Sequence, residues 1–406
     1  MQIKVFWYGK EYPEDWDFYA ECAEGNNIDI SIKNDSSYPK KAPNPKEMVL
    51  QGMAACTAVD IVSTLKKMRQ PLTSLSVACE AQQTTNHPKI FKECQLIYRV
   101  GGKNLDIEKV IQSIFLSYTK YCGVHAIVEK SGCHIFPQVF INDNQVDLWD
   151  PNNSIQEKLK YWVQETGQTQ TKGVALVVGT SKGIGKELVL KLAHEGYAVI
   201  PVGRTKTQFA NKFIFDSLYL DITKPYTSNY IKELLAKNNI KLSLLVQNAG
   251  ISSVINAEDD LNTLQLTMDE LRYVYETNAF GLIESTNIFI PVLTNNATII
   301  LQSSTMGLKE RDSFLNASYR MSKRTVIQYA KQAALQFASE NKDISILSIH
   351  PGSVKTDLNP TGKITTQECV QHIVKILADN FKATLKKHNG AFWIYQPEKN
   401  IWEIKE

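Results

Sequence analysis

The sequence contains no Cys-x-x-Cys pair and no long run of basic residues. Its seven cysteines are an odd number that suits neither a disulfide scaffold nor a zinc site, so we expect free thiols and no metal. The net charge of +3 is spread along the chain and gives no indication of nucleic acid or membrane binding. The start, MQIKVFWYGKEYPEDWDF, lacks the apolar core of a signal peptide, and no membrane span is visible. We therefore expect a cytoplasmic protein.

The length of 406 residues exceeds one ordinary core and predicts two domains. Residues 1–145 show short alternating strands followed by two long helical segments. From residue 174 onward, apolar runs alternate with amphipathic stretches, which indicates a parallel sheet covered by helices. The segment 146–172 between these parts ends in polar Gln and Thr residues and predicts a linker, although its middle could form a short helix.

A glycine-rich turn, GTSKGIG at 179–185, follows an apolar strand and precedes a helical stretch. Gly179, Gly183 and Gly185 can let the backbone approach a pyrophosphate at the helix N-terminus, although an ordinary turn has the same composition. The residue 19 positions past Gly185 is Arg204, where an NAD site usually has an acid. Arg204, helped by Lys182, favours a 2′-phosphate, so we expect NADP(H) in preference to NAD(H).

Tyr319 and Lys323 are four residues apart, which places them on one helical face. The pattern alone is weak, because Tyr395 and Lys399 also match it with Pro397 between them, and proline argues against a helix there. The motifs that surround Tyr319 and Lys323 in the sequence are more specific than the pair itself. Further short signatures occur in the order DIT (221–223), QNAG (247–250), NAFG (278–281), QSSTMG (302–307) and PGSVKTDL (351–358).

These signatures resemble the short-chain dehydrogenase/reductase family over about residues 173–406, and the tail NGAFWIYQPEKNIWEI resembles its C-factor and sniffer-like carbonyl reductase branch. The resemblance implies a Rossmann fold with a doubly wound parallel sheet. It makes Tyr319 the general acid, Lys323 its activator, Ser304 the group that orients a carbonyl and Asn278 part of a proton relay. A nearby ammonium is expected to lower the pKa of the phenol from its usual value of about 10.

The same resemblance implies a set of cofactor-binding residues, with Thr356 near the carboxamide. Capping and turn chemistry would explain Asp221 and Asn248 equally well. The set consists of Gly179, Ser181, Lys182, Gly183, Ile184, Gly185, Arg204, Asp221, Asn248, Ala249, Gly250, Tyr319, Lys323, Pro351, Gly352, Val354 and Thr356.

Two helices are predicted in the first half. In the segment 46–68, Val49, Met53 and Cys56 recur on an apolar face. The segment 107–130 predicts a second helix, and the residues that share one face of it are Ile111, Phe115, Tyr118 and Cys122. A cysteine on an apolar face is commonly a small hydrophobic residue, and periodicity does not establish that the two thiols meet.

Three segments, PKEMVLQGMAACTAVDIV (45–62), NHPKIF (86–91) and SYTKYCGVHAIVEKS (117–131), resemble the OsmC/Ohr family of thiol peroxidases, with DIVSTLKK as in its YhfA-type branch. The resemblance covers about residues 20–142 and implies an α+β fold. It makes Cys56 the peroxidatic thiol, Cys122 the resolving thiol and Glu47 the helix-start acid, although Glu47 is equally explained as a partner of the helix dipole. It also implies a hydroperoxide substrate, an external dithiol reductant and a homodimer.

One departure from that family concerns the thiol activator. Members that reduce organic hydroperoxides use an arginine from the N-terminal strands, and residues 1–68 contain none. The candidates to replace it are Lys10, Lys33, Lys40 and Lys41. His125 is either a pocket group or a surface residue.

The sequence therefore predicts a domain of residues 1–145, a linker of residues 146–172 and a Rossmann domain of residues 173–406. We expect an NADPH-dependent reductase of aldehydes and ketones fused to a peroxide-reducing domain in oxidative-stress detoxification. A protein of a different class stays open: a non-catalytic NADP(H)-sensing or partner-binding module on an OsmC-type dimerisation scaffold.

Overall fold

The computed structural model describes residues 3–7, 17–22, 27–31, 42–150, 154–167, 171–252, 264, 266–308 and 316–405. The chain divides into two compact units, Met1–Ser154 and Ile155–Glu406. The described strands of the first 31 residues form an antiparallel sheet in the order β1-β2-β3. Their bounds are β1 Ile3–Trp7, β2 Asp17–Cys22 and β3 Asn27–Ser31.

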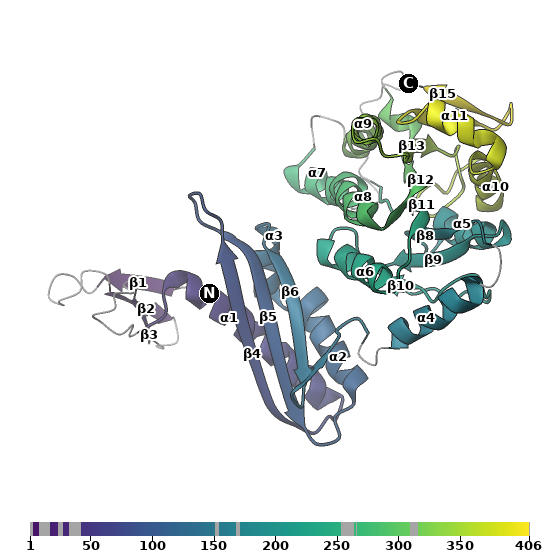
Figure 1. The fold of residues 1–406 in the computed structure, drawn as a ribbon. Helices are drawn as coiled ribbons and strands as arrows, with labels where there is room; N and C mark the ends of the chain where they lie inside the picture. Colours follow the sequence, from purple (N-terminus) through teal and green to yellow (C-terminus); the bar gives the residue numbers. More distant parts are fainter. Residues whose placement is uncertain are drawn as a thin grey trace. The chain divides into compact units, whose positions relative to one another are not determined.

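The rest of the first unit is a sheet in the order β4-β5-β6-β7, with β5 and β6 parallel and the other pairs antiparallel. Helices lie against one face of it (Figure 1). The elements are α1 Pro45–Lys67, β4 Leu72–Gln83, β5 Phe91–Gly102, α2 Ile107–Leu116, a π-helix Ser117–Tyr121, α3 Gly123–Lys130, β6 His134–Ile141 and β7 Asn144–Val146. This α+β arrangement confirms the predicted fold class of the first half.

Helix α1 begins and ends within one residue of the predicted 46–68. Asn44 caps it, because the Asn44 side chain accepts from Glu47 N and the Glu47 carboxylate accepts from Asn44 N, each at 3.0 Å. The buried stripe of α1 differs from the predicted face and consists of Met53, Thr57, Ile61 and Leu65. Val49 is 42% exposed, so the predicted apolar face is not buried along its whole length.

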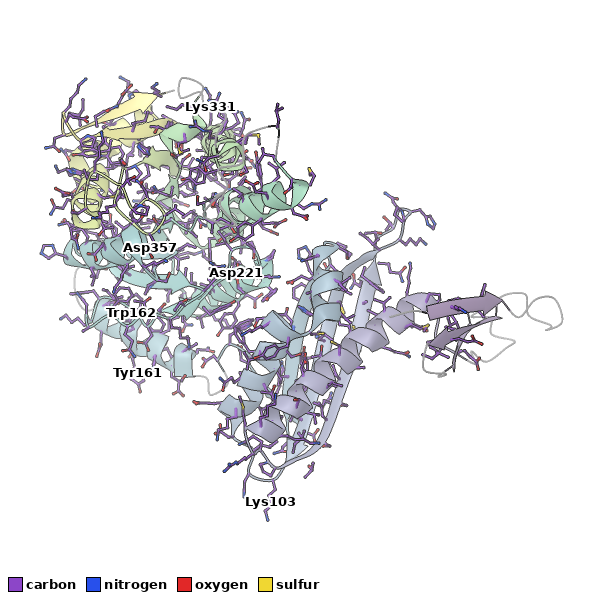
Figure 2. The ribbon with its side chains drawn as sticks, turned by 180° about the vertical axis from the view of Figure 1, so that it is seen from behind. Lys103, Tyr161, Trp162, Asp221, Lys331 and Asp357 are labelled. Carbon is purple, nitrogen blue, oxygen red and sulfur yellow. The ribbon has the colours of Figure 1, made fainter. Side chains whose placement is uncertain are left out.

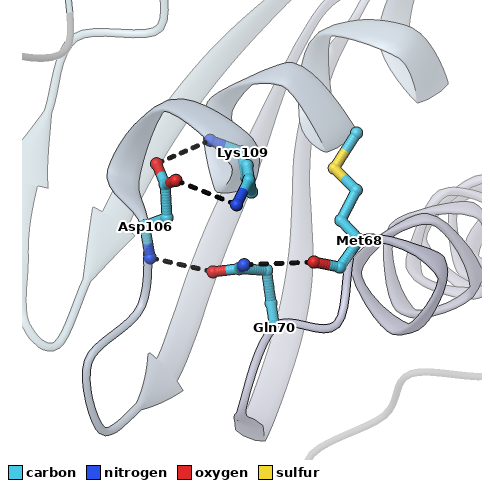
Figure 3. A network of polar contacts seen from close by, with 4 residues as sticks. All are labelled: Met68, Gln70, Asp106 and Lys109. Atoms are coloured by element: carbon cyan, nitrogen blue, oxygen red, sulfur yellow. Dashed lines mark hydrogen bonds and ion pairs between the residues drawn. The ribbon is translucent and has the colours of Figure 1, made fainter.

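A polar network joins the end of α1 to the start of α2 (Figure 3). The side chain of Gln70 donates to the carbonyl of Met68, which ends α1, and accepts from Asp106 N at 2.9 Å. Asp106 in turn caps α2 by accepting from Lys109 N. Because the network joins the two caps, it fixes these helices relative to each other at that end.

The second predicted helix is interrupted. Helix α2 ends at Leu116, the π-helix Ser117–Tyr121 comes next, and Cys122 adopts an extended conformation as the N-cap of α3. The count that assumed a continuous helix through Cys122 was therefore wrong, because a π turn adds one residue per turn and rotates the residues beyond it.

Among the described helices, α1 alone is long and apolar enough to span a membrane by length and composition, which the sequence analysis did not anticipate. A core helix of a soluble protein meets the same two criteria, and one stripe of α1 is buried within its own unit.

The second unit contains an eight-stranded sheet in the order β10-β9-β8-β11-β12-β13-β14-β15. Its strands are parallel except for the last pair. The strands are β8 Val174–Val178, β9 Ala198–Gly203, β10 Leu218–Tyr219, β11 Leu242–Gln247, β12 Leu293–Gln302, β13 Ser345–His350, β14 Phe392–Gln396 and β15 Ile401–Lys405. The order reverses between β8 and β11, and ligands of such sheets bind beyond the carboxyl ends of the strands at that point.

Helices cover both faces of this sheet (Figure 1). Alternation along β8 separates two cores, since Leu176 and Val178 pack with one layer and Ala175 and Val177 with the other. The first layer contains α4 Ser154–Gly167, α6 Pro225–Lys237, α8 Leu282–Phe289 and α9 Ala317–Ser339, and the second contains α5 Gly183–His194 and α10 Thr366–Ile376. The doubly wound Rossmann prediction is confirmed. Tyr395 lies in β14, so the second Tyr-x-x-x-Lys match is not helical.

Helix α4 occupies the segment that the composition predicts as a linker. Its Leu159 and Trp162 are buried in the core of the second unit, and Trp162 Nε1 donates to Lys212 O at 3.1 Å. The predicted linker 146–172 therefore contains a helix that belongs to the second unit, because two apolar residues in a polar stretch are enough to pack it against that core.

We expect Trp162→Ala to lower the free energy of unfolding of the second unit by about 3 kcal/mol through the loss of a buried indole and its hydrogen bond. The matched control is Tyr161→Ala, because the neighbouring Tyr161 is 70% exposed and should cost less than about 0.5 kcal/mol (Figure 2). Urea titration with hydrogen exchange read from peptides of residues 171–252 measures both. Equal destabilisation by the two changes would contradict the docking of α4.

Candidate active sites

The glycine turn between β8 and α5 is shaped for close backbone approach. Gly179 has φ +84°, and a Cβ there would meet the backbone of Ala249 at 2.8 Å. Gly183 has φ +61° and begins α5. A Cβ on Gly185 would strike the Gly179 carbonyl, so this glycine lets the helix pack on the strand. Lys182 caps α5 without a side-chain hydrogen bond, which leaves the first N–H groups of the helix available to an anion.

A cleft of about 770 Å³ lies at this turn, within the size range of ligand sites. It extends from the glycine turn to Tyr319 and Lys323, and Figure 2 labels Asp221 and Asp357 from its walls. The predicted cofactor-binding residues that line it are Gly179, Ser181, Lys182, Gly183, Ile184, Arg204, Asp221, Asn248, Ala249, Gly250, Tyr319, Lys323 and Thr356.

Four of the predicted cofactor residues do not line the cleft. Gly185 is buried between helix and strand. Pro351, Gly352 and Val354 lie at the base of the loop after β13, where Val354 bridges to Ile364. These three residues lead into the loop segment 355–358, and it is this segment that lines the cleft.

Helix α9 carries Tyr319 and Lys323 one turn apart, with Lys323 buried and Tyr319 half-buried at the cleft wall. Lys323 Nζ donates to Gln302 O at 3.1 Å and lies 5.5 Å from the centroid of the Tyr319 ring. The Tyr319 hydroxyl shares a hydrogen bond with the Ser304 side chain. Ser304 precedes a short 3₁₀ turn, and its Oγ accepts from Met306 N at 3.2 Å.

The pKa of Tyr319 differs from the sequence prediction. Burial raises the pKa of Tyr319 to about 12, and the hydrogen bond from Ser304 only partly offsets this effect. Burial also lowers the pKa of Lys323 to about 8. The expected lowering of the phenol pKa by the ammonium was wrong for this structure, because desolvation of the phenolate is the larger effect.

Asn278 lies in a π-helix, Glu276–Gly281, between α7 (Met268–Tyr275) and α8. Its side chain is fully buried and pairs with both backbone groups of Ile251, accepting from N at 2.8 Å and donating to O at 2.9 Å. A Cβ on Gly250 would lie 3.3 Å from Asn278 Oδ1 and 3.4 Å from Lys323 Nζ. Gly250 therefore leaves room for the asparagine and the lysine to approach the same wall of the cleft.

Asp221 and Asn248 combine structural bonds with a place in the cleft wall. The carboxylate of Asp221 accepts from the N and Oγ1 of Thr223, as in a turn. Asn248 Nδ2 donates to Gly179 O at 2.9 Å and so ties the end of β11 to the glycine turn. Both residues therefore make the structural hydrogen bonds that the turn interpretation of the sequence predicts.

Two cations lie at the glycine-turn end of the cleft. Lys182 Nζ forms an ion pair with Asp357 Oδ2 at 2.6 Å, which connects the glycine turn to the loop after β13. Arg204 is exposed on the cleft wall just after β9 and has no ion pair among the described residues. Arg204 is thus positioned to receive an anion, whereas Lys182 is shared with an acid.

In the first unit, the two thiols that the sequence singled out come together. The Sγ atoms of Cys56 and Cys122 and a carboxylate oxygen of Asp60 all lie within 4.8 Å of one another. Asp60 is one turn after Cys56 on α1, and its Oδ2 accepts from Ser117 Oγ at 2.9 Å. Two sulfurs and a carboxylate at this spacing could also hold a divalent metal such as zinc, whereas the sequence predicts no metal.

Cys122 is more enclosed than Cys56. Its Sγ accepts from Thr57 Oγ1 at 3.4 Å and from His125 N at 3.3 Å. Burial raises the pKa of the Cys122 thiol although these two donors lower it. His125 is buried, so its surface interpretation was wrong. The partly exposed Cys56 is therefore the more accessible sulfur, and Cys122 is the protected one.

The structure gives Glu47 a capping role. It stands nine residues before Cys56, a rise of about 13 Å along the helix. Its catalytic role stays a prediction.

No described cation that would activate the Cys56 thiol is paired with the neighbouring acid, since Asp60 has no ion-pair partner among the described residues. The candidates to replace the arginine, Lys10, Lys33, Lys40 and Lys41, lie outside the described residues.

Three residues at these sites were absent from the sequence prediction. Asp60 could have been found, since it is four residues from Cys56 on a predicted helix. Asp357 contacts Lys182 across 175 positions, and Gln302 acts through its backbone carbonyl. Neither contact can be predicted from a single amino-acid sequence.

Comparison with known proteins agrees with this division. The family model for short chain dehydrogenases matches residues 173–366, and the model for OsmC-like proteins matches residues 38–135. The protein YhfA of Escherichia coli strain K12 is 34% identical over 131 residues, which are 32% of this chain and 91% of YhfA. An uncharacterized oxidoreductase of Schizosaccharomyces pombe is 27% identical over 55% of this chain and 96% of its own length. The crystal structure of NADPH-bound carbonyl reductase from chicken fatty liver aligns with a TM-score of 0.48 at 23% identity, covering 55% of this chain and 96% of that one.

The fold and the cleft define a Rossmann-fold oxidoreductase domain that follows an α+β domain with a paired-thiol site. The chain belongs to the OsmC-like family through its first half and carries a short-chain dehydrogenase/reductase domain in its second, so it is a fusion of the two.

We expect Asp357→Asn to lower the KM for the nicotinamide cofactor about two- to fivefold, because the substitution frees Lys182 and removes a carboxylate from the glycine-turn end of the cleft. The matched control is Asp343→Asn, which removes the same charge from the exposed Asp343–Lys386 pair away from the cleft. Steady-state kinetics at low salt measures both. A higher KM in Asp357→Asn would show instead that the ion pair helps to form the site, and an unchanged KM would show that the pair does not restrain Lys182.

Proposed function

We propose that the second unit reduces aldehydes or ketones with NADPH, and that Tyr319 is its general acid. The supporting observation is that Tyr319 and Lys323 line one end of a cleft whose other end is the glycine turn, with Ser304 hydrogen-bonded to Tyr319 behind the wall. The glycines and the N-terminus of α5 would hold the pyrophosphate, and Lys323 the ribose hydroxyls. NADPH, when bound, supplies the hydride.

The chain's own groups supply the proton. A carbonyl oxygen develops negative charge as its carbon is reduced, so a donor must stand beside it. Tyr319, with a pKa of about 12, keeps its proton at neutral pH and suits this direction of reaction. Ser304 is placed to orient the oxygen. Lys323 and Asn278 lie where the proton lost by Tyr319 could be replaced.

The preference for NADPH over NADH is supported by charge. Arg204 follows β9 where an acid would otherwise bind the adenosine ribose, and Lys182 stands in the glycine turn. A guanidinium can hold a 2′-phosphate through paired hydrogen bonds. In this assignment, Asp221 bounds the adenine end of the cleft.

We expect Tyr319→Phe to lower kcat for NADPH oxidation at least about 100-fold across a panel of aldehydes, ketones and quinones, because the proton donor is lost. Binding of NADPH should change little. The control is Tyr329→Phe on the same helix, whose hydroxyl donates to Asn287 away from the cleft. Tight NADPH binding without turnover of any panel member by the wild type would instead support a sensing module.

We propose that the first unit reduces hydroperoxides through Cys56, with Cys122 as the resolving thiol and an external dithiol as reductant. The proximity and unequal exposure of the two sulfurs support these roles. The Cys56 thiolate would attack the O–O bond and become a sulfenic acid while the alcohol leaves. Cys122 would then displace water to form a disulfide. Together, the two domains would remove peroxides and the reactive carbonyls derived from them.

We expect Cys56→Ser to abolish peroxide consumption in the presence of dithiothreitol, because serine cannot form the sulfenic acid. Cys122→Ser should turn over slowly and accumulate sulfenic acid at Cys56. Cys369→Ser, in the second unit, serves as the control. Equal consumption by wild type and Cys56→Ser would make this unit a scaffold. Repeating the assay with a chelator shows whether a metal at Cys56, Asp60 and Cys122 competes with the reaction.

A further inference from the structure

A second pair of thiols lies in the first unit, separate from Cys56 and Cys122. Cys79 on β4 and Cys94 on β5 place their Sγ atoms 2.8 Å apart. A disulfide needs about 2.05 Å, so the two sulfurs have less than about 1 Å to close. From this contact we propose that Cys79 and Cys94 form a second redox-active dithiol, which peroxides oxidise to a disulfide across the β4–β5 hairpin.

The strand pairing explains how the two side chains meet. Cys79 stands opposite Leu96 and Cys94 opposite Ala81, so the cysteines are diagonal neighbours on antiparallel strands. Both point to the helix-covered face, because the alternation along β4 and β5 puts Cys79 with the less exposed positions and Cys94 with the buried ones. A link between them joins adjacent strands that are already paired and needs no change of register.

The two sulfurs differ in access and acidity, as the two steps of such a reaction require. Cys79 is partly exposed, whereas Cys94 is 1% exposed. The contact between the two sulfurs lowers the pKa of the Cys79 thiol. The same contact, together with burial, raises the pKa of the Cys94 thiol well above its usual range. Cys79 is thus the attacking thiol and Cys94 the resolving one.

The chemistry balances with hydroperoxide as the oxidant. The Cys79 thiolate takes the terminal oxygen, the O–O bond breaks, and the alcohol, or water when hydrogen peroxide is used, leaves with a proton. Cys94 then attacks the sulfenic sulfur, the S–O bond breaks, and the oxygen leaves as water with the Cys94 proton. Two thiols have lost two hydrogens, and one peroxide has gained two electrons.

A third cysteine and a tyrosine lie near this pair. Burial and the neighbouring Cys94 raise the pKa of Cys133 to about 11, so Cys133 remains a thiol. Tyr98 is fully buried, and Cys122 as well as Cys79 and Cys94 raise its pKa. The phenol of Tyr98 is therefore close enough to interact electrostatically with Cys122 of the first thiol pair and with both cysteines of the second. A test must remove the first pair, so that any product belongs to the second.

Trypsin separates the two cysteines, because cleavage at Arg69, Lys89, Lys92 and Arg99 puts them on peptides 70–89 and 93–99. The full chain carrying Cys56→Ser and Cys122→Ser is exposed to hydrogen peroxide under native conditions, alkylated and digested without reductant. We expect peptides 70–89 and 93–99 to be joined with the loss of two hydrogens, and to separate on treatment with dithiothreitol. The wild-type chain should give the same product, so the outcome does not depend on the substituted background.

Two further variants test the roles. Cys133→Ser should leave the linkage intact. Cys94→Ser should abolish it and leave a sulfenic acid at Cys79 that dimedone traps. The proposal is overturned if the native chain gives no linked peptides, if linkage requires urea, or if Cys133→Ser abolishes it. Because peroxide turnover at Cys56 is measured separately, failure here is distinct from failure of the proposed function.

Discussion

The buried ammonium of Lys323 beside the phenol of Tyr319 is the constraint on which the candidate site of the second unit depends. An ammonium removed from water must be compensated, and here Gln302 supplies a carbonyl at 3.1 Å from the end of β12. That contact ties α9 to the sheet edge where the parallel strands end. Asn278 closes the same wall through its paired bonds to Ile251. Lys323 and Asn278 are therefore held by the backbone of the fold, whereas Tyr319 is hydrogen-bonded to the side chain of Ser304.

Both candidate sites use a π-helical turn. The π-helix Glu276–Gly281 contains Asn278, and the π-helix Ser117–Tyr121 immediately precedes Cys122. Each adds a residue to a turn and so shifts the subsequent side chains by about a quarter of a turn. In the first unit, Cys122 comes directly after this shift, and its Sγ lies within 4.8 Å of the Sγ of Cys56 on α1. A regular helix would have continued the face begun at Ile111.

Much of the fold and of the reductase site could be predicted from the sequence. The strand-helix alternation, the glycine turn and the Tyr319–Lys323 spacing are local patterns, and each reflects a short stretch of backbone. The errors share a different cause. The exposure of Val49, the interruption before Cys122 and the pKa of Tyr319 depend on the residues that pack there from elsewhere in the chain. A single sequence carries no record of that packing.

Reduction of a carbonyl by hydride from NADPH, with Tyr319 as proton donor, is the central claim for this protein. The most direct measurement uses NADPH deuterated at both C4 positions, with mass spectrometry of the alcohol formed from a carbonyl substrate. The account predicts one deuterium on the carbinol carbon with the wild-type chain and no labelled alcohol with Tyr319→Phe. Consumption of the carbonyl with no deuterium in the product would contradict it.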